Sequence, residues 1–348
     1  MIRAKEYNIP NTFGIPACAR HYVEYASEVE LQACLPLKGP VLHIGRGSNL
    51  LFDGDYEGTI LHSAITDITD ITDMTETSET AADETWLHVG SGMVFDDLVA
   101  YCIGKGLYGL ENLSAIPGEV GASAVQNIGA YGVEACQCIR RVEGYMTETG
   151  IPFALDGEAC HYGYRQSIFK DSLCGRVAIT YVTFGLSRRF VPQTEYGGIR
   201  QAIEASGLDI HTLTAEALRD IIIDIRRQKL PDPAVQGNAG SFFMNPIVAR
   251  SHYEDIRRKW PEVPHYDVDG GHVKIPAAWL IEQCGWKGRT MGRAAVHERQ
   301  PLVLVNTGGA TAREVLDLCK AVQKSVQERF GIRLQTEVNI ITSTLPQP

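Results

Sequence analysis

The stretch IPGEVGASAVQNIGAYGVE, residues 116–134, decides the fold of this protein more than any other part of the sequence. Small side chains let a backbone approach its neighbour closely, so this segment could lie flat against a large planar ligand. A close contact between a helix and a second helix or a sheet requires small side chains as well, and composition alone leaves both interpretations open. The small residues are Gly118, Gly121, Ala122, Ser123, Ala124, Gly129, Ala130 and Gly132.

A second glycine-rich stretch, HIGRGSNLL, occupies residues 43–51 and follows a short apolar strand. Successive N–H groups in such a turn can form a concave anion site, here for a pyrophosphate. An ordinary glycine turn after a strand has the same composition, so the pattern by itself is weak. It is neither G-x-G-x-x-G nor a P-loop, because the lysine of a P-loop is absent.

The overall composition restricts the class of protein. The 348 residues are enough for roughly two or three domains. Lys and Arg number 32 and Asp and Glu 42, and the net charge of −10 argues against non-specific nucleic-acid binding. No apolar run reaches the about 20 residues that would cross a bilayer, and the N-terminus lacks the apolar core of a signal peptide. We therefore expect a cytoplasmic protein without membrane insertion.

The nine cysteines are dispersed along the chain. The nearest pair, Cys136 and Cys138, has neither the spacing nor the second half of a zinc site. An odd, scattered set is typical of free structural thiols in a reducing cytoplasm. We expect no metal.

An acidic stretch, AITDITDITDMTETSET at residues 64–80, repeats Ile-Thr-Asp three times. A ladder of calcium ligands and a solvated hairpin tip are the two interpretations. The hairpin tip is favoured because calcium loops place denser oxygen ligands around a sharp glycine turn.

Hydrophobic periodicity predicts a mixed α+β chain with strands that end near Gly45, Gly92 and Leu186. A final strand is expected at 333–341, with Leu334, Thr336, Val338 and Ile340 on one face and Arg333, Gln335, Glu337 and Asn339 on the other. Helices are predicted at residues 94–106, 215–228, 275–285 and 311–331. Their end signals are Gly106, Pro276 with Gly285, and a Thr311–Glu314 capping box with Gly331.

Ser241 lies in GNAGSFFMNP, residues 237–246, without a neighbouring histidine. Phe243 stands where G-x-S-x-G requires its second glycine, so a nucleophile elbow is excluded. A serine that only caps a turn is the simple alternative to a catalytic hydroxyl.

Seven blocks of the sequence resemble, in the same order, the family of UDP-N-acetylenolpyruvoylglucosamine reductases. The resemblance extends from about Asn11 to Ile341, and seven ordered blocks are far more specific than one glycine pattern. The blocks are GRGSNLL, IPGEVGASAVQNIGAYGVE, YRQSIFK, KLPDP, GNAGSFFMNP, AVHERQPLVLVN and LQTEVNII.

The resemblance implies an α+β fold: a two-part FAD-binding region of the vanillyl-alcohol oxidase / p-cresol methylhydroxylase type and a C-terminal α+β substrate-binding domain. The expected divisions are FAD-binding subdomains at 1–63 and 64–211 and a substrate-binding domain at 212–348. Non-covalent FAD is expected, because the loop carries Arg46-Gly47-Ser48 where related flavin folds carry a flavin-linking histidine. The implied cofactor-binding residues are Gly45, Arg46, Gly47, Ser48, Asn49, Leu50, Ile116, Pro117, Gly118, Gly121, Ala122, Asn127, Ile128, Gly129 and Ala130.

Three catalytic residues follow from the resemblance. Arg165 would hold the enolpyruvyl carboxylate in a bidentate contact, since a guanidinium stays charged at any working pH. Ser241 would deliver a proton to C2 after hydride reaches C3, because an enolate-like intermediate is basic enough to take it. Glu337 would either orient or protonate the enol, or tune Arg165 and a water; a carboxylate beside an anionic intermediate must be protonated or bridged.

Four further residues are implied to bind the nucleotide sugar. Lys229 and Tyr196 match positions that grip the diphosphate, and the segment of Tyr196 is typical of the form of the enzyme with an extra loop. Asn245 and Gln300 match polar residues of the sugar pocket. Ordinary surface polarity is the alternative for each.

The expected function is NADPH-dependent reduction of UDP-N-acetylglucosamine enolpyruvate through FAD, for peptidoglycan precursor synthesis, by a monomer. No fingerprint for a second dinucleotide appears, so NADPH and substrate are expected to use one pocket in turn. A flavin oxidase of the same fold and a non-catalytic flavin or nucleotide-sugar binding protein are the alternatives. Neither needs a proton donor at Ser241.

Overall fold

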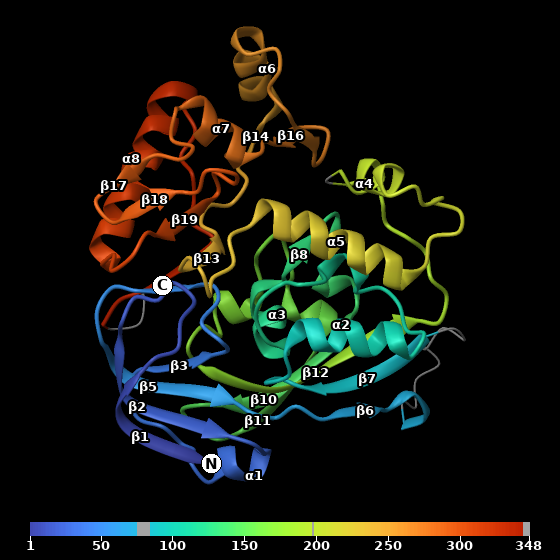
Figure 1. Ribbon diagram of the computed structural model, residues 1–348. Helices are drawn as coiled ribbons and strands as arrows, with labels where there is room; N and C mark the ends of the chain where they lie inside the picture. Colours follow the sequence, from blue (N-terminus) through green and yellow to red (C-terminus); the bar gives the residue numbers. More distant parts are fainter. Residues whose placement is uncertain (75–83, 197, 344–348) are drawn as a thin grey trace.

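The computed structural model describes residues 1–74, 84–196 and 198–343 (Figure 1). The N-terminal part forms a four-stranded sheet in the order β1-β2-β5-β3. β1 is antiparallel to β2, whereas β2, β5 and β3 are mutually parallel. A short helix follows β2, with the Ser27 hydroxyl as its N-cap. The elements are β1 (Ile2–Asn8), β2 (Cys18–Tyr25), α1 (Glu28–Gln32), β3 (Val41–Ile44) and β5 (Tyr56–Ser63).

A second sheet contains five antiparallel strands in the order β11-β10-β12-β7-β6. Its central strand is buried almost throughout, because both of its faces are covered. Ala178 packs against the first sheet, and Val182 and Phe184 pack under helices on the other side. The strands are β6 (Ile68–Asp70), β7 (Glu84–Gly90), β10 (Ile139–Met146), β11 (Pro152–Asp156) and β12 (Val177–Ser187).

Helices α2 and α3 cover this sheet, and α5 lies across them in Figure 1. The helices predicted at 94–106 and 215–228 are confirmed as α2 and α5. Arg219 of α5 contacts Asp96 of α2 through two hydrogen bonds of 2.5 and 2.9 Å. The domain divisions at 63/64 and 211/212 stay a prediction. The helices are α2 (Phe95–Gly104), α3 (Val120–Gln126), α4 (Ile199–Ala205) and α5 (Ala215–Lys229).

The C-terminal region packs α7 and α8 on a sheet in the order β13-β19-β18-β17. Both ends predicted for α8 are confirmed: Thr311 and Glu314 form the capping box, and Gly331 ends the helix at φ +70°. A three-stranded sheet, β14-β16-β15, stands beside α6. The elements are β13 (Asn238–Ser241), β14 (Ile247–Ala249), α6 (Arg250–Lys259), β15 (Tyr266–Asp267), β16 (His272–Lys274), α7 (Ala277–Gln283), β17 (Thr290–Met291), β18 (Ala294–Val296), β19 (Val303–Asn306) and α8 (Ala312–Phe330).

The strand predicted at 333–341 is wrong in its length, because only β20 (Asn339–Ile341) is a strand. The preceding residues are extended but pair elsewhere: Met244 N donates to Gln335 O and Glu337 N to Phe242 O. β20 then pairs in parallel with β4 (Leu50–Phe52), at the end of the glycine-rich stretch 43–51. The segment changes partner between two parts of the fold, which interrupts the ladder.

The acidic stretch at 64–80 is described only in part. Its residues 68–70 form the edge strand β6, which pairs with β7 as a hairpin requires. The predicted tip falls within residues 75–83, which lie outside the described chain.

Candidate active site

A cavity of about 1170 Å³ is lined by residues from both glycine-rich stretches and from the C-terminal region. Most of the predicted site residues meet in it. The predicted residues that line it are Ser48, Asn49, Ile116, Pro117, Gly118, Ala122, Ile128, Gly129, Ala130, Arg165, Tyr196, Lys229, Ser241, Asn245, Gln300 and Glu337. The predicted residues that do not line it are Gly45, Arg46, Gly47, Leu50, Gly121 and Asn127.

The loop between β3 and β4, residues 45–49, is named the anion cradle after the role expected for it. Gly47 has φ +68°, and its carbonyl accepts from the amide of Thr12. Ser48 Oγ donates to Pro117 O over 3.2 Å, which joins the two glycine-rich stretches at the cavity wall. Within the described residues, no acceptor takes the amide protons of residues 46–48. Free N–H groups in a turn suit a phosphate, so this loop fits the pyrophosphate of FAD.

Gly47 cannot carry a side chain without distortion, which gives a first prediction. A β-carbon there would lie 2.3 Å from Pro10 O, in addition to the left-handed φ. Gly47→Ala should lower the free energy of unfolding by about 2 kcal/mol or more, and weaken flavin retention. Gly14→Ala is the control: φ is +65°, but nothing lies within 4 Å. Equal losses in urea unfolding of the two variants would contradict the close contact.

The glycine-rich stretch at residues 116–134 combines both uses that its small residues allow. A β-carbon on Gly121 would lie 2.9 Å from Ser91 Cβ, so this glycine serves packing of α3 against the turn after β7. Gly118 and Ala122 instead face the cavity. Asn127 ends α3 at φ +45°, and its amide is occupied within the chain by Glu134, Gly163 O and the amide of Cys136.

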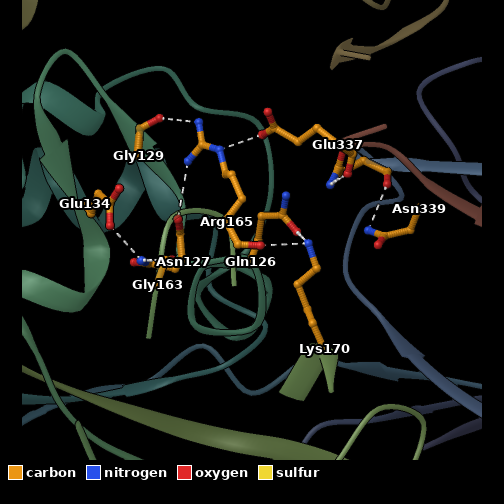
Figure 2. A network of polar contacts seen from close by, with 10 residues as sticks. Gln126, Asn127, Gly129, Glu134, Gly163, Arg165, Lys170, Glu337 and Asn339 are labelled. Atoms are coloured by element: carbon orange, nitrogen blue, oxygen red, sulfur yellow. Dashed lines mark hydrogen bonds and ion pairs between the residues drawn. The ribbon is translucent and has the colours of Figure 1, made fainter. Parts of the chain in front are cut away.

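Arg165 is held rigidly over the cavity by backbone carbonyls (Figure 2). Its terminal nitrogens donate to Asn127 O over 3.3 Å and to Gly129 O over 2.7 Å. Its Nε lies 2.7 Å from Glu337 Oε1 but the N–H is not well aligned, so this contact is an ion pair. A guanidinium has five N–H groups, and one on each terminal nitrogen remains for a ligand. Arg165 itself has φ +56°.

Ser241 and Glu337 are brought together by the backbone. The segments 242–244 and 335–337 are joined by the hydrogen bonds described above and by a bridge between Phe243 and Thr336. Gly240 has φ +69°, which produces an irregularity in β13 before Ser241. Among the described residues, the Ser241 hydroxyl has no hydrogen-bond partner, although it lines the cavity. It is therefore available to a ligand.

Burial controls the charge of Glu337. Burial raises the pKa of Glu337, and Arg165 and Lys170 offset this only in part. Lys170 Nζ donates to Gln126 Oε1 and to Arg165 O, at 3.0 and 2.9 Å, and its positive charge acts to lower the pKa of Glu337. A raised pKa keeps the carboxyl protonated to a higher pH than an exposed glutamate. This meets the requirement that a carboxyl near an anion be protonated or bridged.

The predicted substrate residues lie on the walls of the same cavity. Lys229 is the last residue of α5 and is exposed. Tyr196 stacks on Tyr266, with ring centroids 5.0 Å apart and an interplanar angle of 24°. Asn245 Oδ1 accepts from the first amide of α7 over 2.9 Å, which holds this side chain at the cavity wall. Gln300 Oε1 weakly contacts the amide of Leu302 at 3.5 Å.

Sequence reasoning missed several residues of the cavity. Arg226 lines the cavity from the inner side of α5, which it shares with Arg219, seven residues earlier. It donates a hydrogen bond to Ala115 O over 3.2 Å. That spacing was the available signal. Lys274 lies 4.6 Å from the ring centroid of Tyr164, and no local pattern in the sequence indicates it. Gln126, in the middle of the glycine-rich stretch, lines the cavity, and its buried Nε2 makes no hydrogen bond among the described residues.

Comparisons with known proteins identify the family of this chain. Residues 232–341 match the family "UDP-N-acetylenolpyruvoylglucosamine reductase, C-terminal domain", and residues 19–152 match the "FAD binding domain" family. A protein of Bacteroides fragilis (strain YCH46) named UDP-N-acetylenolpyruvoylglucosamine reductase is 50% identical over 334 residues, 95% of this chain and 97% of its own. The chain belongs to the UDP-N-acetylenolpyruvoylglucosamine reductase family. It is an FAD-dependent oxidoreductase.

Other relatives of the family are similar over the same length. A protein of Amoebophilus asiaticus with the same name is 45% identical over 344 residues, 96% of this chain and 98% of its own. The crystal structure of UDP-N-acetylenolpyruvylglucosamine reductase from Thermus caldophilus covers 97% of this chain and 98% of its own at 22% identity, with a TM-score of 0.64, which supports the fold. The predicted fold class is confirmed.

The described part of the chain was searched for membrane-spanning helices and for metal sites. Across residues 1–74, 84–196 and 198–343, no helix is both long and apolar enough to span a bilayer. The same residues contain no group of three or more His, Cys, Asp or Glu placed to hold a metal ion.

Proposed function

We propose that this protein reduces UDP-N-acetylglucosamine enolpyruvate to UDP-N-acetylmuramate with NADPH, as a step of peptidoglycan precursor synthesis. The observation that carries the proposal is the convergence of Arg165, Ser241 and Glu337 on one cavity beside both glycine-rich stretches. When bound, FAD supplies the hydride, from N5 to C3 of the enolpyruvyl group, after reduction by NADPH. The residues of the cavity bind the substrate, deliver the proton and limit the access of water.

Arg165 binds the enolpyruvyl carboxylate with its two remaining N–H groups, in the bidentate geometry that a guanidinium favours. This polarises the double bond and makes C3 a hydride acceptor. Ser241 delivers the proton to C2, and the buried Phe242 and Phe243 beside it limit the access of water. Glu337 holds Arg165 in place and, protonated, donates a hydrogen bond to the developing enolate.

Lys229, Tyr196, Asn245 and Gln300 hold the nucleotide-sugar part of the substrate. Cations supply the attraction for its diphosphate despite the net charge of −10. Besides Lys229, Arg226 and Lys274 line the same cavity. A local basic wall can therefore bind an anion against the overall field of the protein.

One cavity for both partners predicts ping-pong kinetics. NADPH alone should reduce the flavin under anaerobic conditions, and UDP-N-acetylglucosamine enolpyruvate should then reoxidise it. Double-reciprocal plots should give parallel lines. Intersecting lines, with no flavin reduction by NADPH alone, would refute the proposal. Rapid oxygen consumption without the nucleotide sugar would favour an oxidase, and bound flavin without turnover a binding protein.

The pH dependence of substrate reduction tests the protonation of Glu337. Because its folded-state pKa is raised, the active protonated form is present at low pH and is lost as pH rises through that pKa. The rate of flavin reoxidation by substrate should fall over this range in the unmodified protein. Glu337→Gln keeps the hydrogen-bond donor but cannot ionise, so this fall in rate with rising pH should disappear. If the fall in rate persists in Glu337→Gln, the group that titrates is not Glu337.

A further inference from the structure

His62 lies between two carboxylates behind the anion cradle. It is on β5, where it pairs with Ile44, the residue before the cradle begins at Gly45. Its Nδ1 lies 2.9 Å from Glu24 Oε2, and its Nε2 lies 3.2 Å from Glu119 Oε1. The His62 side chain is 20% exposed, and that of Glu119 only 7%.

Glu119 brings a negative charge to the wall of a site for an anion. It lines the cavity in front of α3, and a β-carbon on Gly45 would lie 3.0 Å from its Oε2. The absence of a side chain at Gly45 thus lets the carboxylate lie against the cradle. An uncompensated carboxylate here would repel the pyrophosphate of FAD, and burial strengthens that repulsion. Apart from its contact with His62, this carboxylate makes no hydrogen bond or ion pair with the residues that the structure describes, and the proposed reaction does not use it.

The hydrogen-bond geometry indicates how this charge is compensated. Carboxylates only accept, so an imidazole that contacts one with each ring nitrogen satisfies both only as an imidazolium. The other groups that face His62 are the Tyr22 ring, stacked at 6.4 Å, and His43 on β3. His43 contacts Tyr25 Oη at 3.0 Å, and burial lowers its pKa to about 3, so it adds no charge.

The pKa of His62 agrees with this geometry. Burial acts to lower it, but the hydrogen bonds and charges of Glu119 and Glu24 outweigh burial and raise it. The imidazolium therefore persists to a higher pH than that of an exposed histidine. It is lost as pH rises through the raised value.

We infer that His62 is a positioning residue for the cofactor, whose imidazolium neutralises Glu119 and so allows the cradle at residues 45–49 to bind the FAD pyrophosphate. The inference rests on FAD as the cofactor but not on the identity of the substrate. It makes FAD affinity depend on pH, with tighter binding below the pKa of His62 than above it. Removal of the Glu119 charge removes the need for His62.

Equilibrium dialysis of the flavin-loaded protein tests the inference, with retained FAD measured by visible absorbance from about pH 6 to about pH 9. In the unmodified protein the Kd for FAD should rise with pH. His62→Gln should raise the Kd about ten- to hundredfold at low pH and remove most of the pH dependence. Glu119→Gln should bind FAD tightly at every pH, and the double variant should resemble Glu119→Gln.

A matched histidine provides the control. His88 Nε2 lies 3.1 Å from Glu143 Oε2 on the second sheet, and neither residue lines the cavity. His88→Gln should leave the Kd for FAD unchanged, and thermal unfolding of every variant reports on folding. The inference is overturned if Glu119→Gln weakens FAD binding, or if the double variant binds no better than His62→Gln. Failure of the proposed reaction would instead leave FAD retention intact and abolish only substrate turnover.

Discussion

Ser241→Ala is expected to reduce the rate of flavin reoxidation by UDP-N-acetylglucosamine enolpyruvate by about 10²–10⁴-fold, the usual loss when a general acid is removed. The reduction of the flavin by NADPH should survive, because no proton to C2 is needed in that half-reaction. The Ser241 hydroxyl lines the cavity and makes no hydrogen bond to the described part of the chain, and its backbone is fixed by β13, so the alanine variant should keep the fold. Stopped-flow absorbance of the flavin separates the two half-reactions.

A serine outside the cavity controls for the loss of a hydroxyl. Ser172 is exposed and lies between the last residues of the YRQSIFK block and β12. Ser172→Ala should leave both half-reactions unchanged. Equal losses in the two half-reactions of Ser241→Ala would indicate misfolding or loss of flavin rather than loss of an acid. Full activity of Ser241→Ala would reject the serine as the proton donor.

Arg165→Met should have the second large effect, because it leaves Glu337 buried without its ion-pair partner. The side chains of this pair are only 16% and 14% exposed. Removal of one partner of a buried pair typically costs about 3–5 kcal/mol of unfolding free energy when the other stays charged. The loss should therefore be greatest at high pH and should shrink as Glu337 takes up a proton at lower pH. Urea unfolding across pH measures it.

The same variant should lose the enolpyruvyl carboxylate contact, so the KM for the nucleotide sugar should rise while NADPH still reduces the flavin. The double variant Arg165→Met/Glu337→Gln should lose less unfolding free energy than the two single variants lose together, because the two residues are in contact. Arg141→Met is the control: its contacts with Glu143 and Asp156 are 3.4 and 3.5 Å at the surface, and its loss should stay below about 1 kcal/mol. Strict additivity in the double variant would show that Arg165 and Glu337 do not interact.

Much of the local structure was predictable from sequence, since its causes are local. The spacing of Thr311 and Glu314 predicted the capping box that begins α8, and Gly331 predicted its end in a left-handed conformation. The resemblance in seven blocks led to the FAD-binding region and to the C-terminal domain. Most residues it implied for the site line one cavity.

Other features depend on which distant segments meet. The last strand was predicted too long because alternation cannot reveal that residues 335–337 pair with 242–244 while β20 pairs with β4. Those two pairings place Glu337 between Ser241 and the anion cradle. Asn127 was expected to bind cofactor, yet its side chain is occupied by Glu134, Gly163 and Cys136.

By itself, the sequence determined where helices and turns begin and end and which residue types are available for chemistry, because caps, glycine conformations and periodicity act over a few residues. Only the tertiary structure decided the charge state of those residues. Burial keeps Glu337 protonated to a higher pH, and the approach of Glu24 and Glu119 from separate segments keeps His62 charged. Desolvation and ion pairing depend on distances between remote parts of the chain, which no local pattern contains.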